Sequence, residues 1–239
     1  MAPRYRRVVI KISGAALARP DRRGLDSDAL RHIAGQVLEA ADLGTQVAMV
    51  VGGGNFFRGS LADQWGIERA EADSIGMLGT VMNGLILRGA LNSLSERDVR
   101  VMTAMPIPSV AEPFIRLRAI AHLERGTLVV LAGGIGQPYV TTDYPSVQRA
   151  LELQADALLV AKHGVDGVYT GDPKTDPDAR RLDTITYDDA ISGDLRVMDP
   201  SAFILARDHG LPIHVFDIAG DGTMAAIVRG EDVGTRITP

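Results

Sequence analysis

Three glycine-rich turns, each at the end of a short apolar run, are the groups best suited to chemistry in this chain. The runs at residues 8–12, 47–51 and 128–131 lead into Lys11-Ile12-Ser13-Gly14, Gly52-Gly53-Gly54 and Gly133-Gly134-Ile135-Gly136. Glycine lets backbone N–H groups approach an anion without hindrance from a Cβ atom, and Lys11 and Arg58 add positive charge nearby. Together the turns predict a phosphate site, although each alone could be an ordinary strand-to-helix turn.

The sequence lacks the common motifs for phosphate and nucleophile chemistry. It has no Gly-Lys pair, which excludes a P-loop, and no Gly-x-Gly-x-x-Gly after the first apolar run, which disfavours a dinucleotide fold. Its five histidines show neither metal-ligand spacing nor a nucleophile partner. These absences suit a reaction whose nucleophile is a phosphate oxygen, because that oxygen is already ionised at neutral pH. Catalysis would then consist of holding two anions in line and offsetting their charge.

Several charged residues are ambiguous between chemistry and local structure. Asp143 lies just before an expected helix and Asp199 lies before Pro200 at the start of another, so either could be a helix cap as readily as a carboxylate near a transferred group. Asp172 precedes a proline and could simply turn the chain. Lys11 and Lys162 end apolar runs, where a charge is costly to bury, yet a lysine at a strand end can also extend its ammonium group to water.

Composition narrows the class of protein. The chain has 239 residues, of which 46% are hydrophobic and 23% charged, as expected for a folded globular chain with a sizeable core. A net charge of −5 disfavours nucleic acid as a partner, and the absence of cysteine excludes disulfides and thiolate metal sites. The apolar run after the basic N-terminus is broken at Lys11, so no signal peptide or membrane span is expected and a cytoplasmic location is predicted.

Strands and helices are expected to alternate along the whole chain. Strands are predicted at residues 8–12, 47–51, 99–103, 128–131, 157–161 and 213–216, and helices at 26–44, 73–91, 112–123, 145–153, 197–206 and 224–228. Continuous apolar strands between helices predict an α/β fold with a mainly parallel sheet covered on both faces. Ligands of such sheets bind at the carboxyl ends of the strands, where the glycine turns lie.

Eight short motifs follow one another in a familiar order. They are the segments 11–14, 51–59, 73–78, 80–84, 141–143, 165–173, 196–199 and 205–208. With them the chain resembles the bacterial UMP kinases of the amino-acid-kinase superfamily, from Arg6 to Ile237. The resemblance implies a single domain, residues 1–239, with a three-layer α/β/α sandwich. It also implies ATP-dependent phosphorylation of UMP to UDP in pyrimidine nucleotide biosynthesis, with an acceptor lobe at about 1–155 and an ATP lobe at about 156–239.

The resemblance also implies roles for individual residues. The catalytic residues would be Lys11, Arg58, Asp143 and Asp199. ATP would be bound by Lys11, Ile12, Ser13, Gly14, Gly54, Arg58, His163, Tyr169 and Asp172. UMP would be bound by Gly53, Asp73, Ile135, Gly136, Gln137, Pro138, Tyr139, Val140, Thr141 and Thr142. Mg²⁺ would enter with ATP, bound through its phosphates without a direct protein ligand. The family implies a homohexamer that GTP activates and UTP inhibits.

The chain departs from the family pattern beside the expected acceptor pocket. Ile135 and Gln137 stand where the family usually has threonine and asparagine, and Tyr144 and Pro145 replace small residues. Two other functions therefore stay open. One is a kinase of the same fold with another small anionic acceptor. The other is a nucleotide-binding or sensing protein without turnover, although Lys11 and the other expected catalytic residues argue against it.

Overall fold

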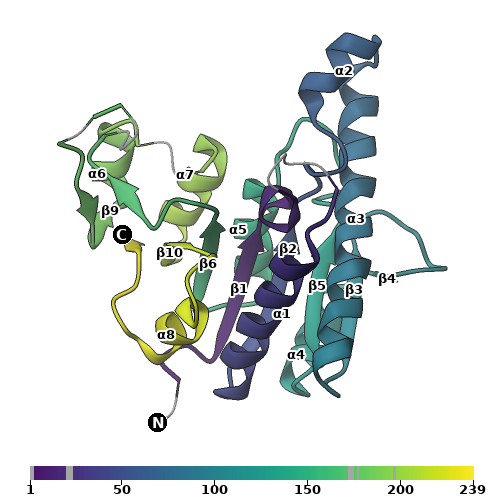
Figure 1. Cartoon of the computed structure of the whole chain (residues 1–239), viewed down its shortest axis with the longest axis horizontal. Coiled ribbons are helices and arrows are strands. Elements are labelled where there is room, and N and C mark those ends of the chain that lie inside the picture. Colours follow the sequence, from purple (N-terminus) through teal and green to yellow (C-terminus); the bar gives the residue numbers. More distant parts are fainter. Residues whose placement is uncertain (1–2, 20–23, 172–174, 177, 196–197) are drawn as a thin grey trace.

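The computed structural model describes residues 3–19, 24–171, 175–176, 178–195 and 198–239. Over these residues a central sheet of nine strands runs in the order β4-β3-β5-β2-β1-β6-β10-β11-β9, and β7 and β8 form a small separate ribbon (Figure 1). The strands are β1 (Arg7–Ile12), β2 (Gln46–Val51), β3 (Val99–Thr103), β4 (Glu112–Pro113), β5 (Leu128–Ala132), β6 (Ala157–Lys162), β7 (Val168–Tyr169), β8 (Arg181–Leu182), β9 (Thr184–Thr186), β10 (Ile213–Asp217) and β11 (Thr235–Thr238). The helices are the 3₁₀ turn η1 (Gly14–Leu17), α1 (Ser27–Asp42), α2 (Gly59–Trp65), α3 (Arg69–Leu94), α4 (Arg116–Glu124), α5 (Asp143–Glu152), α6 (Tyr187–Ser192), α7 (Pro200–Asp208) and α8 (Thr223–Arg229).

The sheet is parallel apart from one pairing, that of β10 with β11. Strand β1 lies at its centre, between β2 and β6, and all six of its residues are buried. A strand in this position has both faces covered and both edges paired, which explains its run of β-branched residues. The predicted mainly parallel α/β sheet is confirmed.

Helices cover both faces of the sheet, so the molecule has three layers. Alternate residues of β1 point to opposite faces: Val8 and Ile10 pack with α1, α3 and α8, whereas Val9 packs with α4, α5, α6 and α7. Neither layer of helices could bury its apolar side without the strands, so the two cores form together. The carboxyl ends of the parallel strands are left facing one rim of the molecule.

Helix α3 is the longest element and extends past that rim together with α2 (Figure 1). By length and composition α3 is the one helix among the described residues that could cross a membrane. In the structure it packs against α1, β3 and β5, and its buried residues include Leu87 and Leu91. Its apolar character is thus partly explained by its place in one layer of the sandwich.

Several predicted boundaries were wrong for identifiable reasons. The predicted helix at 112–123 begins only at Arg116, because Glu112 and Pro113 pair with β3. The long helix begins at Arg69, four residues before the predicted start at Asp73. Helix α7 begins at Pro200, whose ring favours the first helical position. The short elements α2, α6, β9 and β11 had no clear periodicity and were not predicted.

Candidate active site

The glycine turns after β1 and β2 pack backbone against backbone at the carboxyl rim. A Cβ atom on Gly14 would lie 2.7 Å from the backbone nitrogen of Gly54, far closer than such atoms approach. Only glycine therefore allows the two turns to meet. The contact brings the backbones of two different loops to one space, and a shared anion site at glycine turns needs such an arrangement.

Contacts with helix α3 hold these turns in position. A Cβ atom on Gly53 would lie 2.5 Å from the carbonyl oxygen of Gly76 in α3. The Asn83 side chain donates to the carbonyl oxygen of Gly52 at 2.6 Å. The hydroxyl of Thr80 accepts from the backbone N–H of Gly133 at 2.7 Å, which ties the third turn to the same helix. All three predicted turns thus share one rim.

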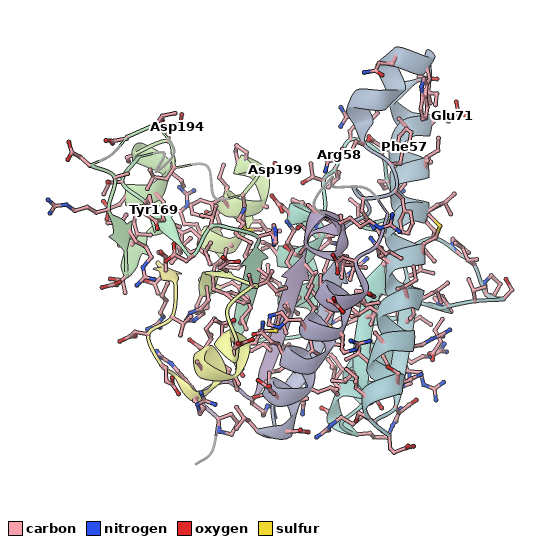
Figure 2. All side chains as sticks on the ribbon, in the orientation of Figure 1. Phe57, Arg58, Glu71, Tyr169, Asp194 and Asp199 are labelled. Carbon is pink, nitrogen blue, oxygen red and sulfur yellow. The ribbon has the colours of Figure 1, made fainter. Side chains whose placement is uncertain are left out.

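The turns and α3 enclose a cavity of about 730 Å³, which we call the glycine cleft. Its lining includes many of the residues predicted to bind phosphate or acceptor: Ser13, Gly14, Gly53, Gly54, Arg58, Asp73, Ile135, Gln137, Val140, Thr141 and Thr142. Arg58 lies at the rim, where its Nε donates to the carbonyl oxygen of Gly54 at 3.0 Å. Figure 2 shows Arg58 and Asp199 at this same end of the sheet, on different elements.

Asp73 joins α3 to the loop that closes the cleft. Both of its carboxylate oxygens accept from Arg69 Nε at 3.0 Å, and one accepts from the backbone N–H of Tyr139 at 2.7 Å. Tyr139 has a φ of 66°, which is uncommon for a residue with a side chain. The bond to Asp73 stabilises this backbone conformation and so shapes the loop.

A buried ion pair lies at the end of β1. Lys11 Nζ is 2.8 Å from Asp143 Oδ1, and the two side chains are only 10% and 16% exposed. Burial by itself raises the pKa of the Asp143 carboxyl. The charge and hydrogen bond of Lys11, aided by Lys162 and the backbone N–H of Asp199, outweigh burial, so this pKa lies below its ordinary value. Asp143 is therefore held as a carboxylate.

Asp199 is a second aspartate beside this ion pair. Its backbone N–H donates to Asp143 Oδ2 at 3.1 Å, and its carboxylate accepts from the hydroxyl of Thr141. Within the described residues the Asp199 side chain makes no capping bond to α7, and that of Asp143 faces Lys11. The contacts favour a site role over capping for both aspartates.

A second cavity, of about 690 Å³, adjoins this ion pair. Its polar end is formed by Asp143, Lys162 and Asp199, and its other walls include the apolar side chains Ala190, Ile191, Leu195, Met198, Phe203 and Ile204. Burial, followed by the like charge of Lys11, lowers the pKa of Lys162, although Asp143 and Asp199 act in the opposite sense. Thr142 lines the glycine cleft, and its neighbour Asp143 lines the second cavity. The Lys11–Asp143 ion pair therefore lies where the two cavities meet.

The remaining predicted residues lie outside these linings. The side chain of Ile12 is buried in the core, so only its backbone could bind a ligand. Gly136, Pro138 and Tyr139 belong to the closing loop, but among the described residues they line neither cavity. His163 and Tyr169 also line neither cavity. The hydroxyl of Tyr169 instead donates to the Asp166 carboxylate at 2.7 Å. Asp172 lies outside the described residues.

Comparisons with known proteins agree with this geometry. The profile of the Amino acid kinase family matches residues 6–217. The chain belongs to the amino acid kinase family. Within it, the chain is 60% identical to the uridylate kinase of Frankia alni, over 98% of this chain and 91% of the relative. The chain is also 44% identical to the uridylate kinase of Pediococcus pentosaceus, over 98% of this chain and 97% of the relative.

Solved structures of this family share the whole fold. The UMP kinase of Bacillus anthracis superposes with a TM-score of 0.96 at 53% identity, covering 98% of this chain and 96% of the other. The UMP kinase of Ureaplasma parvum superposes with a TM-score of 0.92 at 32% identity, covering 99% of this chain and 100% of the other. The resemblance to bacterial UMP kinases and the predicted amino-acid-kinase sandwich are confirmed.

Sequence reasoning left three residues of this kinase fold out of the site. Arg69 was not singled out, although its spacing of four residues from Asp73 on a helix is a usable signal. Thr80 was quoted only as part of a motif, and its bond to Gly133 could not be foreseen. Lys162 was noticed but given no role. Among the residues that the structure describes, no group of three or more His, Cys, Asp or Glu side chains could hold a metal ion.

Proposed function

We propose that the protein transfers the γ-phosphoryl group of ATP to the phosphate of UMP, which gives ADP and UDP. The observation that carries this function is the buried Lys11–Asp143 pair at the meeting point of two cavities. A cation fixed there by a carboxylate would face the charge that develops on a phosphoryl group in transfer. The uridylate kinase relatives support UMP as the acceptor.

UMP is proposed to occupy the glycine cleft. Its base and phosphate would lie along the closing loop from Ile135 to Thr142, with a ribose hydroxyl on Asp73. The phosphates of ATP would bind the turn of Ser13 and Gly14, with Gly54 and Arg58 assisting. Mg²⁺ would arrive with ATP as part of the substrate. Because the acceptor oxygen is already ionised, Asp143 and Asp199 would orient groups and would not remove a proton.

The second cavity supports a site for the rest of the donor nucleotide. Its charged end adjoins the ion pair, and its apolar walls suit a base that must leave water. His163, Tyr169 and Asp172 remain the residues proposed for the adenosine part, and because His163 and Tyr169 do not line this cavity, they would contact the nucleotide outside it. In this arrangement the donor and the acceptor approach the Lys11–Asp143 pair from opposite sides, as in-line transfer requires.

Release of ADP, measured with a coupled assay, tests this function. The assay would compare UMP, CMP, dUMP and GMP as acceptors at saturating MgATP. Turnover that is fastest with UMP supports the proposal. Fastest turnover with another acceptor would favour a related kinase, a reading that the changed residues Ile135 and Gln137 keep open. Nucleotide binding without ADP release from any acceptor would favour a binding or sensing protein.

Assembly into a homohexamer is proposed as well, together with activation by GTP, inhibition by UTP and a cytoplasmic role in pyrimidine nucleotide synthesis. The described structure offers one observation in favour of self-association. Leu78 and Met82, four residues apart on α3, are 45% and 44% exposed and form an apolar stripe. Light scattering on the wild type and on a Leu78→Glu/Met82→Glu variant tests it: a smaller particle is expected for the variant, and an unchanged mass would refute this surface.

A further inference from the structure

Lys162 lies on the same face of the sheet as Lys11. On β6, Leu158 and Val160 belong to the core beneath α5 and α7, and alternation along a strand puts Lys162 on that face too. On β1 the same rule relates Val9 to Lys11. Figure 1 shows β1 and β6 side by side. Two lysines therefore end neighbouring strands and point into the same layer.

This position is the reversal point of the sheet. From β1 the chain proceeds to β2 on one side, and β6 lies on the other side. Ligands of open parallel sheets bind in the crevice formed at such a point. Ile12 pairs with Ala161, so Lys162 stands one residue beyond the paired segment, level with the turn that begins at Ser13.

Lys162 is the group in the second cavity that suits an anionic ligand. Asp143 and Asp199 form the polar end of the second cavity together with Lys162, and Asp143 is already in contact with Lys11. Lys162 is thus the only cation among the described residues that line this cavity, together with the carboxylates of Asp143, Asp194 and Asp199, and the rest of the lining is apolar. A phosphate group entering this cavity would be attracted to Lys162 and repelled by the carboxylates, so its binding would depend on this cation.

We propose that Lys162 is a further phosphate-binding residue of the transfer site, which contacts the phosphates of the donor nucleotide from the second cavity. The inference rests on the proposed function, and it assigns the two lysines different tasks. Lys11 lies two residues before Ser13, in the turn proposed for the ATP phosphates at the glycine cleft, where the phosphoryl group would meet the acceptor. Lys162 lies in the cavity proposed for ATP and would keep its contact as ADP forms. Loss of Lys162 should therefore weaken ATP and ADP and leave UMP nearly unaffected.

Two substitutions with matched chemistry test this role. Lys162→Met keeps the length of the side chain and removes its charge, whereas Lys162→Arg keeps the charge. Arg97→Met is the control, because Arg97 makes an ion pair with Asp42 away from both cavities. Calorimetry with ATP and with ADP, in the absence of UMP, reports binding independently of turnover. Steady-state assays then give kcat and the KM of each substrate, and urea unfolding reports on the fold.

For Lys162→Met we expect Kd for ATP and ADP to rise about 10- to 100-fold, which is the typical effect of one hydrogen bond to a charged group. KM for UMP should change less than about twofold, and Lys162→Arg should recover part of the ATP affinity. Wild-type affinity for ATP in Lys162→Met, or an equal loss for ATP and UMP, would overturn the assignment. If the wild type binds ATP but does not phosphorylate UMP, the proposed function fails while the binding comparison still decides the role of Lys162.

Discussion

Replacing Lys11 by methionine separates the catalytic and structural roles of the ion pair. The change leaves the Asp143 carboxylate buried with its closest cation gone. Breaking a buried ion pair on one side typically costs about 3–5 kcal/mol. Lys162 and the N–H of Asp199 still face Asp143, so we expect about 3 kcal/mol, the lower end of that range. We expect kcat to fall by about 100-fold or more, because the change removes the cation proposed to face the developing charge.

A double variant makes this prediction sharper. Lys11→Met/Asp143→Asn removes the stranded charge as well, so most of the lost stability should return while kcat stays low. Urea unfolding at pH 7 and the coupled ADP assay measure the two effects.

Because the pKa of Asp143 is lowered in the folded state, the pair contributes stability above the ordinary carboxyl pKa of about 3.9 and loses it as the pH falls further. The stability difference between Lys11→Met and the wild type should thus shrink in acid. A double variant no more stable than Lys11→Met, or a single variant with near-normal turnover, would refute this reasoning.

Three further changes test other parts of the structure. Asp73→Asn should raise KM for UMP about 10-fold or more and change KM for ATP little, because a charged acceptor of hydrogen bonds is lost; the reverse pattern in steady-state kinetics would exchange the two pockets. Gly53→Ala should lower the urea midpoint and kcat together, since its new methyl group would overlap the backbone of Gly76. Gly89→Ala is the control, because its Cβ would meet open space and Gly89 lines neither cavity. Burial lowers the pKa of His214 from 6.5 to about 4, so folding stability should decline by up to about 3 kcal/mol as the pH falls from 6.5 to about 4; unfolding midpoints of His214→Gln should lack this slope, and equal slopes would argue against a neutral buried His214.

The sheet could be predicted from the sequence because its strands are buried on both faces. Continuous apolar runs such as residues 8–12 leave few other structures, and a turn rich in glycine marks where each one ends. The short elements escaped prediction for the opposite reason. Helix α6 has six residues and β9 has three, too few for periodicity to appear. Their formation depends on contacts such as the parallel pairing of β9 with β11, which lies about fifty residues further along the chain.

The candidate site was predicted in outline, but its contacts were not. Glycine turns at strand ends predicted a shared rim, and the close approach of Gly14 to Gly54 agrees with that expectation. Whether Asp143 and Asp199 cap helices or face the site could not be decided from sequence, because both roles put an aspartate at a helix start. The contact with Lys11 favours the site role for Asp143. Arg69 lay outside the prediction because its role is to hold Asp73, and a supporting residue carries no motif of its own.

The structure separates the groups proposed to move phosphate from those proposed to choose the acceptor. The first set is fixed by contacts that tolerate little change: backbone packing at Gly14 and Gly53, and a buried ion pair at Lys11. The second set includes Ile135 and Gln137, which line the glycine cleft on the loop held by the N–H of Tyr139 and by Gly133. The bonds at Gly133 and Tyr139 are made by the backbone, so the side chains of Ile135 and Gln137 can vary without breaking them. We therefore expect substitutions at Ile135 and Gln137 to change acceptor preference in this chain while the groups proposed for phosphoryl transfer stay in place.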